Sequence, residues 1–169
     1  MKYPYTLIAG LLGALVMVLP AAAGEKIVVG WIEKVRIYPG NFIVHAKLDS
    51  GAEYSSLDAV NLTEFDRNGQ PWVRFDLPQG DGQKITIERP LLRTATIKRH
   101  YLESQKRPVV KIGVCLGDFY KETEVNLVDR TGFQYRMLIG RKFMEGAVII
   151  DPSAKYTVEP NCKGTPTFE

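Results

Sequence analysis

The stretch AKLDSGAEYSSLDA, residues 46–59, decides the fold more than any other part of the sequence. Apolar residues alternate up to Leu48, which is typical of a strand with one buried face, and the chain then enters the tetrapeptide DSGA at 49–52. Gly51 lets the backbone turn sharply, so the pattern predicts a carboxylate, Asp49, held at a strand end. An alternative interpretation is an ordinary Asx turn, in which Asp49 only accepts local N–H groups.

The rest of the chain repeats short β-rich runs separated by turn residues. These runs are KIVVGWIEKVRI, FIVHAKL, WVRFDL, KITIE, PLLRTATIK, RPVVKIGVCL, EVNLV, YRMLI and AVIID. One face of a single run carries Val110, Ile112, Val114 and Leu116, and one face of another carries Val44, Ala46 and Leu48. Helical periodicity is scarce, and only one short helix is expected, from Arg141 to the stop signal at Gly146. We therefore predict an all-β fold, a small closed or strongly curled β-barrel with one short helix.

The first residues have the features of a signal peptide. Lys2 precedes an apolar run over 7–19, and three alanines then provide the small residues that a signal peptidase reads. This predicts a signal peptide over 1–23 and a single domain over 24–169. The alternative, an uncleaved anchor, is at the short limit for a membrane span and is interrupted by Pro20.

Either interpretation of the leader exports the domain. No cysteine follows the apolar run, so no lipid attachment is expected. We expect a periplasmic or secreted protein with no stable membrane insertion after cleavage of the leader. Cys115 and Cys162 could form a disulfide there, worth about 4 kcal/mol by the chain-entropy model, or remain one buried and one exposed thiol.

Charge and motifs exclude several classes of function. The formal net charge of +3 is too small to indicate a nucleic-acid surface, so no nucleic-acid partner is expected. Neither a GxxxxGK[ST] loop nor a GxGxxG turn is present, so no nucleotide cofactor is predicted. His45 and His100 form no HExxH pair, and no metal site is predicted. His45 falls at an outward position of its strand, where a solvated imidazole is expected.

A second segment, YRMLIGRKFMEG at 135–146, complements the first. It is an apolar strand that ends at Gly140 and enters the short helix. The two segments together resemble the retropepsin-type aspartic proteases, over most of the mature chain. More narrowly, RPVVKIGVCLG and VDRTGFQYRMLIGRKFM resemble a bacterial branch historically labelled ATP-dependent zinc proteases. The resemblance implies a retropepsin (acid protease) barrel in which the later strand threads through the first loop.

The resemblance also implies roles for individual residues. Asp49 would be the catalytic carboxylate, and Ser50 would supply the hydroxyl that stabilises the paired loops. The backbone of Gly51 and Ala52 would flank a bound peptide, and Gly140 would allow close packing behind Asp49. This chain has DSGA where the commoner pattern is DTGA, a change that keeps the hydroxyl and removes one methyl group.

Two further residues of this resemblance are charged. Viral relatives carry an acid after the tetrapeptide and an Arg after the second Gly, and here those positions hold Glu53 and Arg141. The resemblance implies an ion pair between them that supports the active-site loop and the dimer edge.

One chain supplies one such aspartate, whereas the chemistry needs two carboxylates, one ionised and one protonated. A symmetric homodimer acting on a peptide or protein substrate, without metal or cofactor, is therefore expected. A mobile hairpin tip is predicted at 77–84 and is the candidate flap. The basic residues between 89 and 107 form either a ridge near the groove or a solvated face.

Two other functions fit the same sequence. One is a noncatalytic peptide-binding or scaffolding module that keeps the barrel, since a fold does not guarantee an activity. The other is a zinc-dependent hydrolase, which would require His45, His100 and scattered carboxylates to converge.

Overall fold

The computed structural model describes residues 25–79, 82–99 and 102–164, and the expected signal peptide lies outside these ranges. The elements are β1 (Ile27–Tyr38), β2 (Phe42–Leu48), β3 (Ser55–Asp58), β4 (Val60–Arg67), β5 (Gln70–Pro78), β6 (Lys84–Pro90), β7 (Arg93–Arg99), β8 (Leu102–Leu116), β9 (Phe119–Val128), β10 (Met137–Ile139), α1 (Arg141–Met144) and β11 (Val148–Lys155). In these ranges no helix is long and apolar enough to cross a membrane.

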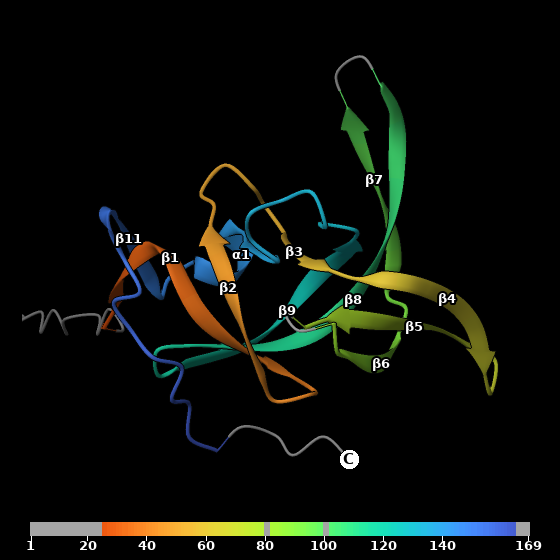
Figure 1. Ribbon diagram of the computed structural model, residues 1–169, viewed down its shortest axis with the longest axis horizontal. Coiled ribbons are helices and arrows are strands. Elements are labelled where there is room, and N and C mark those ends of the chain that lie inside the picture. The colour runs from red at the N-terminus through yellow and green to blue at the C-terminus, as the bar shows by residue number, and fades with distance from the viewer. Residues whose placement is uncertain (1–24, 80–81, 100–101, 165–169) are drawn as a thin grey trace, which may run out of the picture.

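Six of the strands close into a ring. The neighbours follow the order β1, β2, β10, β3, β9 and β8, and β8 pairs with β1 over Arg36–Tyr38 to close it. The short β10 lies between β2, which is parallel to it, and β3, which is antiparallel (Figure 1). A late strand therefore passes between the two strands that flank the DSGA loop. The predicted all-β barrel with one short helix is confirmed.

The alternating residues of β2 and β8 fill the interior of the ring. Val44, Ala46 and Leu48 are buried, as are Val110, Ile112, Val114 and Leu116. The helix α1 covers one end of the core with Phe143 and Met144, and Gly146 follows it with a positive φ of 79°. These placements match the sequence predictions, because apolar burial at a period of two determines which face of each strand points inward.

Strands β4, β5 and β6 form a separate antiparallel sheet beside the ring. One face of this sheet packs on the common core through Val73, Phe75, Leu77 and Ile87. Its strand β4 is exposed over most of its length and lies far to the right in the view of Figure 1. The segment 77–84 connects β5 to β6, with Pro78 opposite Lys84, so the predicted hairpin is present.

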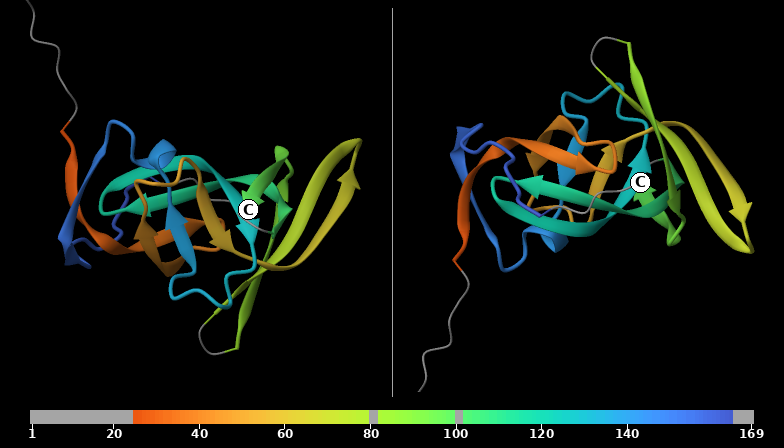
Figure 2. Two further views of the ribbon diagram at one scale, coloured as in Figure 1. Left: turned by 90° about the horizontal axis from the view of Figure 1, so that it is seen from above. Right: turned by 90° about the horizontal axis from the view of Figure 1, so that it is seen from below.

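Strands β7 and β8 form a second hairpin, which projects away from the ring (Figures 1 and 2). The C-terminal part of β8, from Val109 to Leu116, belongs to the ring. Among the described strands, β7 pairs with β8 alone. The hairpin therefore presents a free strand edge, with hydrogen-bonding groups that no neighbouring strand uses.

The chain after β11 crosses the outside of the ring and is fixed to it. Cys162 forms a disulfide with Cys115 of β8, so the two thiols are not free. The fully buried carboxylate of Glu33 accepts hydrogen bonds from the amides of Gly30 (2.7 Å) and Thr157 (2.9 Å) and from the Thr157 hydroxyl (2.7 Å). Multiple donors replace the water that this carboxylate loses on burial.

Candidate active site

The DSGA loop begins where β2 ends. The Asp49 amide donates to the Ile139 carbonyl of β10 (2.8 Å), which continues the parallel pairing of the two strands past Leu48. Asp49 Oδ1 accepts the Gly51 amide (2.9 Å), and the Asp49 carbonyl accepts the Ala52 amide (3.2 Å). These bonds are those of an Asx turn, and they fix the orientation of the carboxyl group.

The second carboxyl oxygen of Asp49, Oδ2, makes no hydrogen bond among the described residues and forms only a long ion pair with Lys47. The side chain is 27% exposed, and Oδ2 lies 3.9 Å from Lys47 Nζ. One oxygen is thus engaged by the loop and the other is available to water or to another group. An oriented, accessible carboxylate can bind and activate water. A carboxylate with both oxygens occupied by loop amides could not do so.

Gly140 allows α1 to pack tightly against the end of this loop. A Cβ at Gly140 would lie 2.5 Å from the Tyr54 carbonyl carbon and 2.7 Å from the Glu53 oxygen. The Gly140 amide donates to Ser55 Oγ (3.1 Å). The close approach expected for Gly140 is present, but it is to the Glu53–Tyr54 backbone rather than to Asp49 itself.

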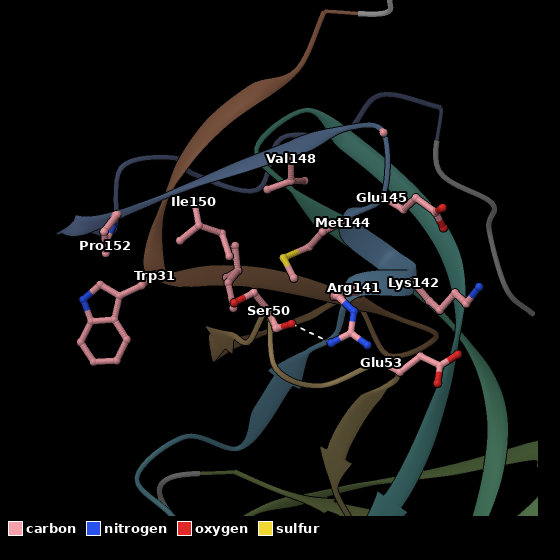
Figure 3. Close-up of a pocket in the computed structure, with 12 residues that line it drawn as sticks. Trp31, Ser50, Glu53, Arg141, Lys142, Met144, Glu145, Val148, Ile150 and Pro152 are labelled. Carbon is pink, nitrogen blue, oxygen red and sulfur yellow. Dashed lines mark hydrogen bonds between the residues drawn. The ribbon is translucent and has the colours of Figure 1, made fainter.

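The expected ion pair between Glu53 and Arg141 is not formed. Arg141 Nη1 donates instead to the Ser50 carbonyl (2.7 Å), and its amide donates to the Ala52 carbonyl (2.9 Å). The backbone of α1 thus sits so close to the loop that the guanidinium reaches across to Ser50 (Figure 3). Arg141 supports the loop as expected, although through backbone carbonyls, and the exposed Glu53 carboxylate makes no ion pair among the described residues.

The remaining loop residues lie at the surface. Ser50 and Gly51 are exposed and Ala52 is half-buried. Among the described residues the Ser50 hydroxyl has no hydrogen-bond partner within the chain, so its implied role toward a paired loop stays a prediction.

A hollow of about 850 Å³ opens on one side of the loop, between α1, β11 and the start of β1. Figure 3 shows Val148 and Ile150 of β11 above it, with Arg141 between Ser50 and Glu53. Its apolar lining comes from Trp31, Leu48, Met144, Val148, Ile150 and Pro152. Its charged lining comes from Glu53, Glu145, Arg141 and Lys142. We call this hollow the loop-side face.

A second hollow, of about 480 Å³, lies on the other side of the loop, between it and the β7–β8 hairpin. We call it the hairpin pocket. The loop contributes Ala52, Glu53 and Tyr54, and the hairpin contributes Arg93, Ala95, Ile97, Arg107 and Val109. Arg130 and Phe133 complete it from the segment that precedes β10. The pocket therefore carries three arginines.

The β7–β8 hairpin, and not 77–84, faces the DSGA loop. None of the described residues 77–79 and 82–84 lines either hollow, because β5 and β6 pack on the core from elsewhere. The flap assignment made from the sequence is therefore wrong. Of the basic segment predicted as either a ridge or a solvated face, Arg89 lies in β6, whereas Arg93 and Arg107 belong to this hairpin and line the pocket.

Arg130 fixes the wall of the pocket that precedes β10. Its guanidinium donates to Tyr135 O (3.0 Å) and Ser56 Oγ (3.1 Å), and its amide donates to the buried Asp58 carboxylate (2.7 Å). Burial lowers the pKa of Arg130 from its ordinary value, and the charges of Asp58 and Asp49 oppose that shift.

Several of these residues carried no signal in the sequence. Trp31 follows Gly30, where the register between β1 and β11 shifts. The glycine within a strand pattern is the one sequence feature that indicates this irregularity. Tyr54 and Phe133 line the pocket from a loop and a turn, and nothing in their local sequence indicates a pocket.

The donor set for a metal is not assembled in the described part of the chain. No group of three or more His, Cys, Asp or Glu side chains gathers there. His45 is exposed as predicted, and its ring lies 5.1 Å from that of Tyr156 on the outer surface. His100 lies outside the described residues.

This geometry agrees with the comparison to known families. Residues 28–161 match the RimB-like family, described as retropepsin-like aspartic endopeptidase RimB. The chain belongs to this family. The resemblance inferred from residues 46–59 and 135–146 is thereby confirmed, and the family covers the ring, the three-stranded sheet and the hairpin alike.

Curated relatives of this RimB-like chain carry a different name. Probable alpha-L-glutamate ligases of Shewanella pealeana and Shewanella halifaxensis are 39% and 38% identical to it over 116 residues. The match covers 67% of this chain and 25% of each relative, so the chain spans about a quarter of their length. A relative of the same name from Parasynechococcus marenigrum is 32% identical over 137 residues.

A solved structure has the same fold. A Legionella pneumophila protein, Lpg0085, described as of unknown function, superposes with a TM-score of 0.71 at 33% identity. The match covers 80% of the RimB-like chain and all of that protein.

Proposed function

We propose that the protein is an aspartic endopeptidase that hydrolyses peptide bonds with water activated between the Asp49 carboxylates of two copies. The observation that carries the proposal is the Asp49 loop. Its carboxyl group is oriented by the Gly51 amide through one oxygen and is open at the other. Membership of the retropepsin-like family supports the same chemistry.

The mechanism needs two carboxylates in different protonation states. The ionised one takes a proton from water, and the protonated one polarises the scissile carbonyl. Two aspartates about 3 Å apart across a twofold axis share one proton, because like charges resist simultaneous ionisation. Water is the nucleophile, so the reaction needs no covalent intermediate.

The loop-side face supports a second copy as the partner. A twofold interface places the same patch on both subunits, so the patch must be complementary to itself. This face combines apolar side chains with two acids, Glu53 and Glu145, and two bases, Arg141 and Lys142. Such a set can satisfy itself across an axis, and it lies directly beside Ser50 of the loop.

The hairpin pocket supports an acidic peptide as the substrate. Arg93, Arg107 and Arg130 line it, and Glu53 is the one acid in the lining, although Glu124 outside the lining pairs with Arg93. The relatives named alpha-L-glutamate ligase point to the same class, since a glutamate-bearing polypeptide is the kind of product that such a name describes. We propose that acidic residues of an extended substrate occupy this pocket.

We also propose that the protein works outside the cytoplasm, in the periplasm or after secretion. The disulfide between Cys115 and Cys162 supports this location, because disulfides persist in oxidising compartments. The N-terminal sequence of the exported protein tests it: a first residue at Gly24 agrees with cleavage of 1–23, and recovery from the cytoplasm with an intact leader would contradict it.

The test of the activity is digestion of a peptide library, including glutamate-rich peptides, by the purified exported protein from about pH 3 to 7. We expect Asp49→Asn to abolish cleavage and a chelator to leave it unchanged. The matched control is Asp66→Asn, which removes a carboxylate that also accepts a turn amide, but in the β4–β5 hairpin.

Two other results would replace the proposal. Cleavage that a chelator removes would revive the zinc-dependent hydrolase. Peptide binding without cleavage by a folded dimer would identify a noncatalytic binding module.

A further inference from the structure

We propose that Arg93 is a positioning residue that couples the β7–β8 hairpin to the catalytic loop. The inference rests on the proposed endopeptidase function for its role in catalysis, whereas the coupling itself can be measured without any activity. Arg93 contacts neither Asp49 nor the groups that form the hydrogen bonds of the DSGA loop. Its effect on the loop is transmitted through Tyr54.

The guanidinium of Arg93 makes two kinds of contact at once. Its edge donates to Glu124 Oε2 of β9 from Nε (3.1 Å) and Nη2 (2.6 Å). Its carbon Cζ lies 4.8 Å from the centre of the Tyr54 ring. A planar guanidinium can use its edge and its face together, which a lysine ammonium cannot do.

Tyr54 joins this contact to the active-site loop. It is the residue between Glu53, at the end of the loop, and Ser55, the first residue of β3. Its carbonyl group packs against Gly140 so closely that no Cβ would fit there. Tyr54 is thus held between Gly140 on its backbone side and Arg93 on its ring side.

Arg93 is also the first residue of β7. Of the β7 side chains at 93–97, only that of Arg93 makes a hydrogen bond or an ion pair. Ala95 and Ile97 extend the same face of the strand along the hairpin pocket. On the other strand of the hairpin, Arg107 donates to Asn126 Oδ1 of β9 (3.0 Å). The base of the hairpin is therefore fixed from both strands, and Arg93 is the side chain of β7 that also contacts the Tyr54 ring.

This arrangement has a consequence for substrate binding. An extended peptide adds to the free edge of β7, and its scissile bond must then lie at Asp49. The distance between hairpin and loop must stay fixed for both conditions to hold, because small displacements from the productive geometry reduce the rate strongly. Arg93 maintains that distance.

The structure offers a matched control far from the site. Arg74 of β5 donates from Nε to Glu88 Oε1 (2.7 Å), and its Cζ lies 5.4 Å from the Phe65 ring. It has the same combination of ion pair and ring contact, and a similar exposure of 54% against 42% for Arg93. Arg74→Lys therefore removes equivalent interactions without touching the loop.

The first readout is hydrogen–deuterium exchange of the whole protein. We expect Arg93→Lys to raise exchange at the amides of 49–54 and 141–142 about threefold, the order expected for a partly exposed ring and ion-pair contact. Glu124→Gln should act in the same direction, because it weakens the edge contact. Arg74→Lys should leave these amides at the wild-type rate. An unchanged rate in Arg93→Lys would overturn the inference.

The second readout is cleavage of an extended peptide. The peptide contains no acidic residues, so that a direct contact of Arg93 with an acidic substrate side chain does not contribute. We expect Arg93→Lys to raise KM and lower kcat together, for a loss in kcat/KM of about three- to tenfold at an unchanged melting temperature. Kinetics equal to those of Arg74→Lys would overturn the catalytic role. If the wild type cleaves no peptide while the exchange result holds, the proposed function fails and the coupling of hairpin and loop stands.

Discussion

The ring and the three-stranded sheet are stabilised in different ways. The ring buries side chains on both faces of β8 where it pairs with β1 and β9, including Val114 and Cys115. The sheet buries apolar side chains on one face only, and its other face is held by pairs such as Arg67 with Glu88 and Lys84 with the buried Asp76. Packing therefore governs the part of the molecule that carries Asp49, and electrostatics contributes more to the part that does not.

This contrast predicts a graded response to substitution. Changes in the ring should cost several kcal/mol and should disturb the loop, whereas changes on the outer face of the sheet should cost little and depend on pH and salt. The following predictions begin with the largest expected effect.

Removal of the disulfide should have the largest effect on stability. Cys115 and Cys162 are separated by 47 residues, and a loop of that length corresponds to about 4 kcal/mol of stabilisation in the chain-entropy model. We expect a loss of that order in the free energy of unfolding of Cys115→Ser/Cys162→Ser, measured by denaturant titration. Reduction of the wild-type protein should give the same loss, and a stability independent of reductant would contradict the assignment.

Gly140→Ala should come next. The new methyl group would lie 2.5 Å from the Tyr54 backbone, so the loop or α1 must move. We expect a loss of about 3 kcal/mol in the free energy of unfolding, within the range for overpacked sites. Peptide cleavage should fall as well. The control is Gly132→Ala, where a Cβ meets no atom within 4 Å, and equal losses in the two variants would refute the explanation.

Asp76 should make the sheet sensitive to acid. Hydrogen bonds from Lys84, Thr86 and Asn61 hold the pKa of this carboxyl well below its usual range. A lowered folded-state pKa stabilises the protein above the unfolded pKa, near 3.9, and that contribution disappears as the pH falls further.

The measurement is amide exchange from about pH 6 to 3, with rates corrected for the intrinsic effect of pH. We expect protection in β4, β5 and β6 to fall before protection in the ring. Asp76→Asn should weaken the sheet at neutral pH and reduce this acid dependence. Simultaneous loss of protection in both regions would show that they unfold as one unit.

The smallest effect is expected for Arg74→Ala. Its ion pair with Glu88 is exposed, and such pairs contribute about 0.2 to 1 kcal/mol, less at high salt. Thermal unfolding at low and high salt measures this contribution. A loss above about 2 kcal/mol in the free energy of unfolding would show that the outer face of the sheet contributes as much to stability as the ring does. The contrast between the two regions would then not hold.

The sequence predicted most of the strands, the helix and the aspartate loop because each depends on local signals, whereas β3 and β4 were not among the predicted runs. Alternation places Leu48 inside, Asp49 accepts the amide two residues further on, and Gly140 follows an apolar strand that can enter the core. These residues act within a few positions of one another or through a close backbone approach that only glycine permits.

The flap could not be assigned in the same way. Gly and Pro residues correctly marked a hairpin at 77–84, but which hairpin faces Asp49 depends on how β5 and β7 leave the core. The prediction that Arg141 pairs with Glu53 was wrong for a related reason. It rested on opposite charge, whereas the closeness of α1 to the loop makes the Ser50 carbonyl the nearer acceptor.

The disulfide has a consequence beyond the stability of the fold. Between its two cysteines the chain includes β9, β10, α1 and β11. Two elements that contact the DSGA loop, β10 and α1, therefore belong to one segment that the disulfide closes covalently. Under the proposed endopeptidase function, one copy of the protein can cut another. A single nick between 116 and 161 would open this covalently closed segment but release no fragment, because both new ends remain joined through Cys115 and Cys162. The disulfide would then protect the proposed peptidase against fragmentation by its own copies.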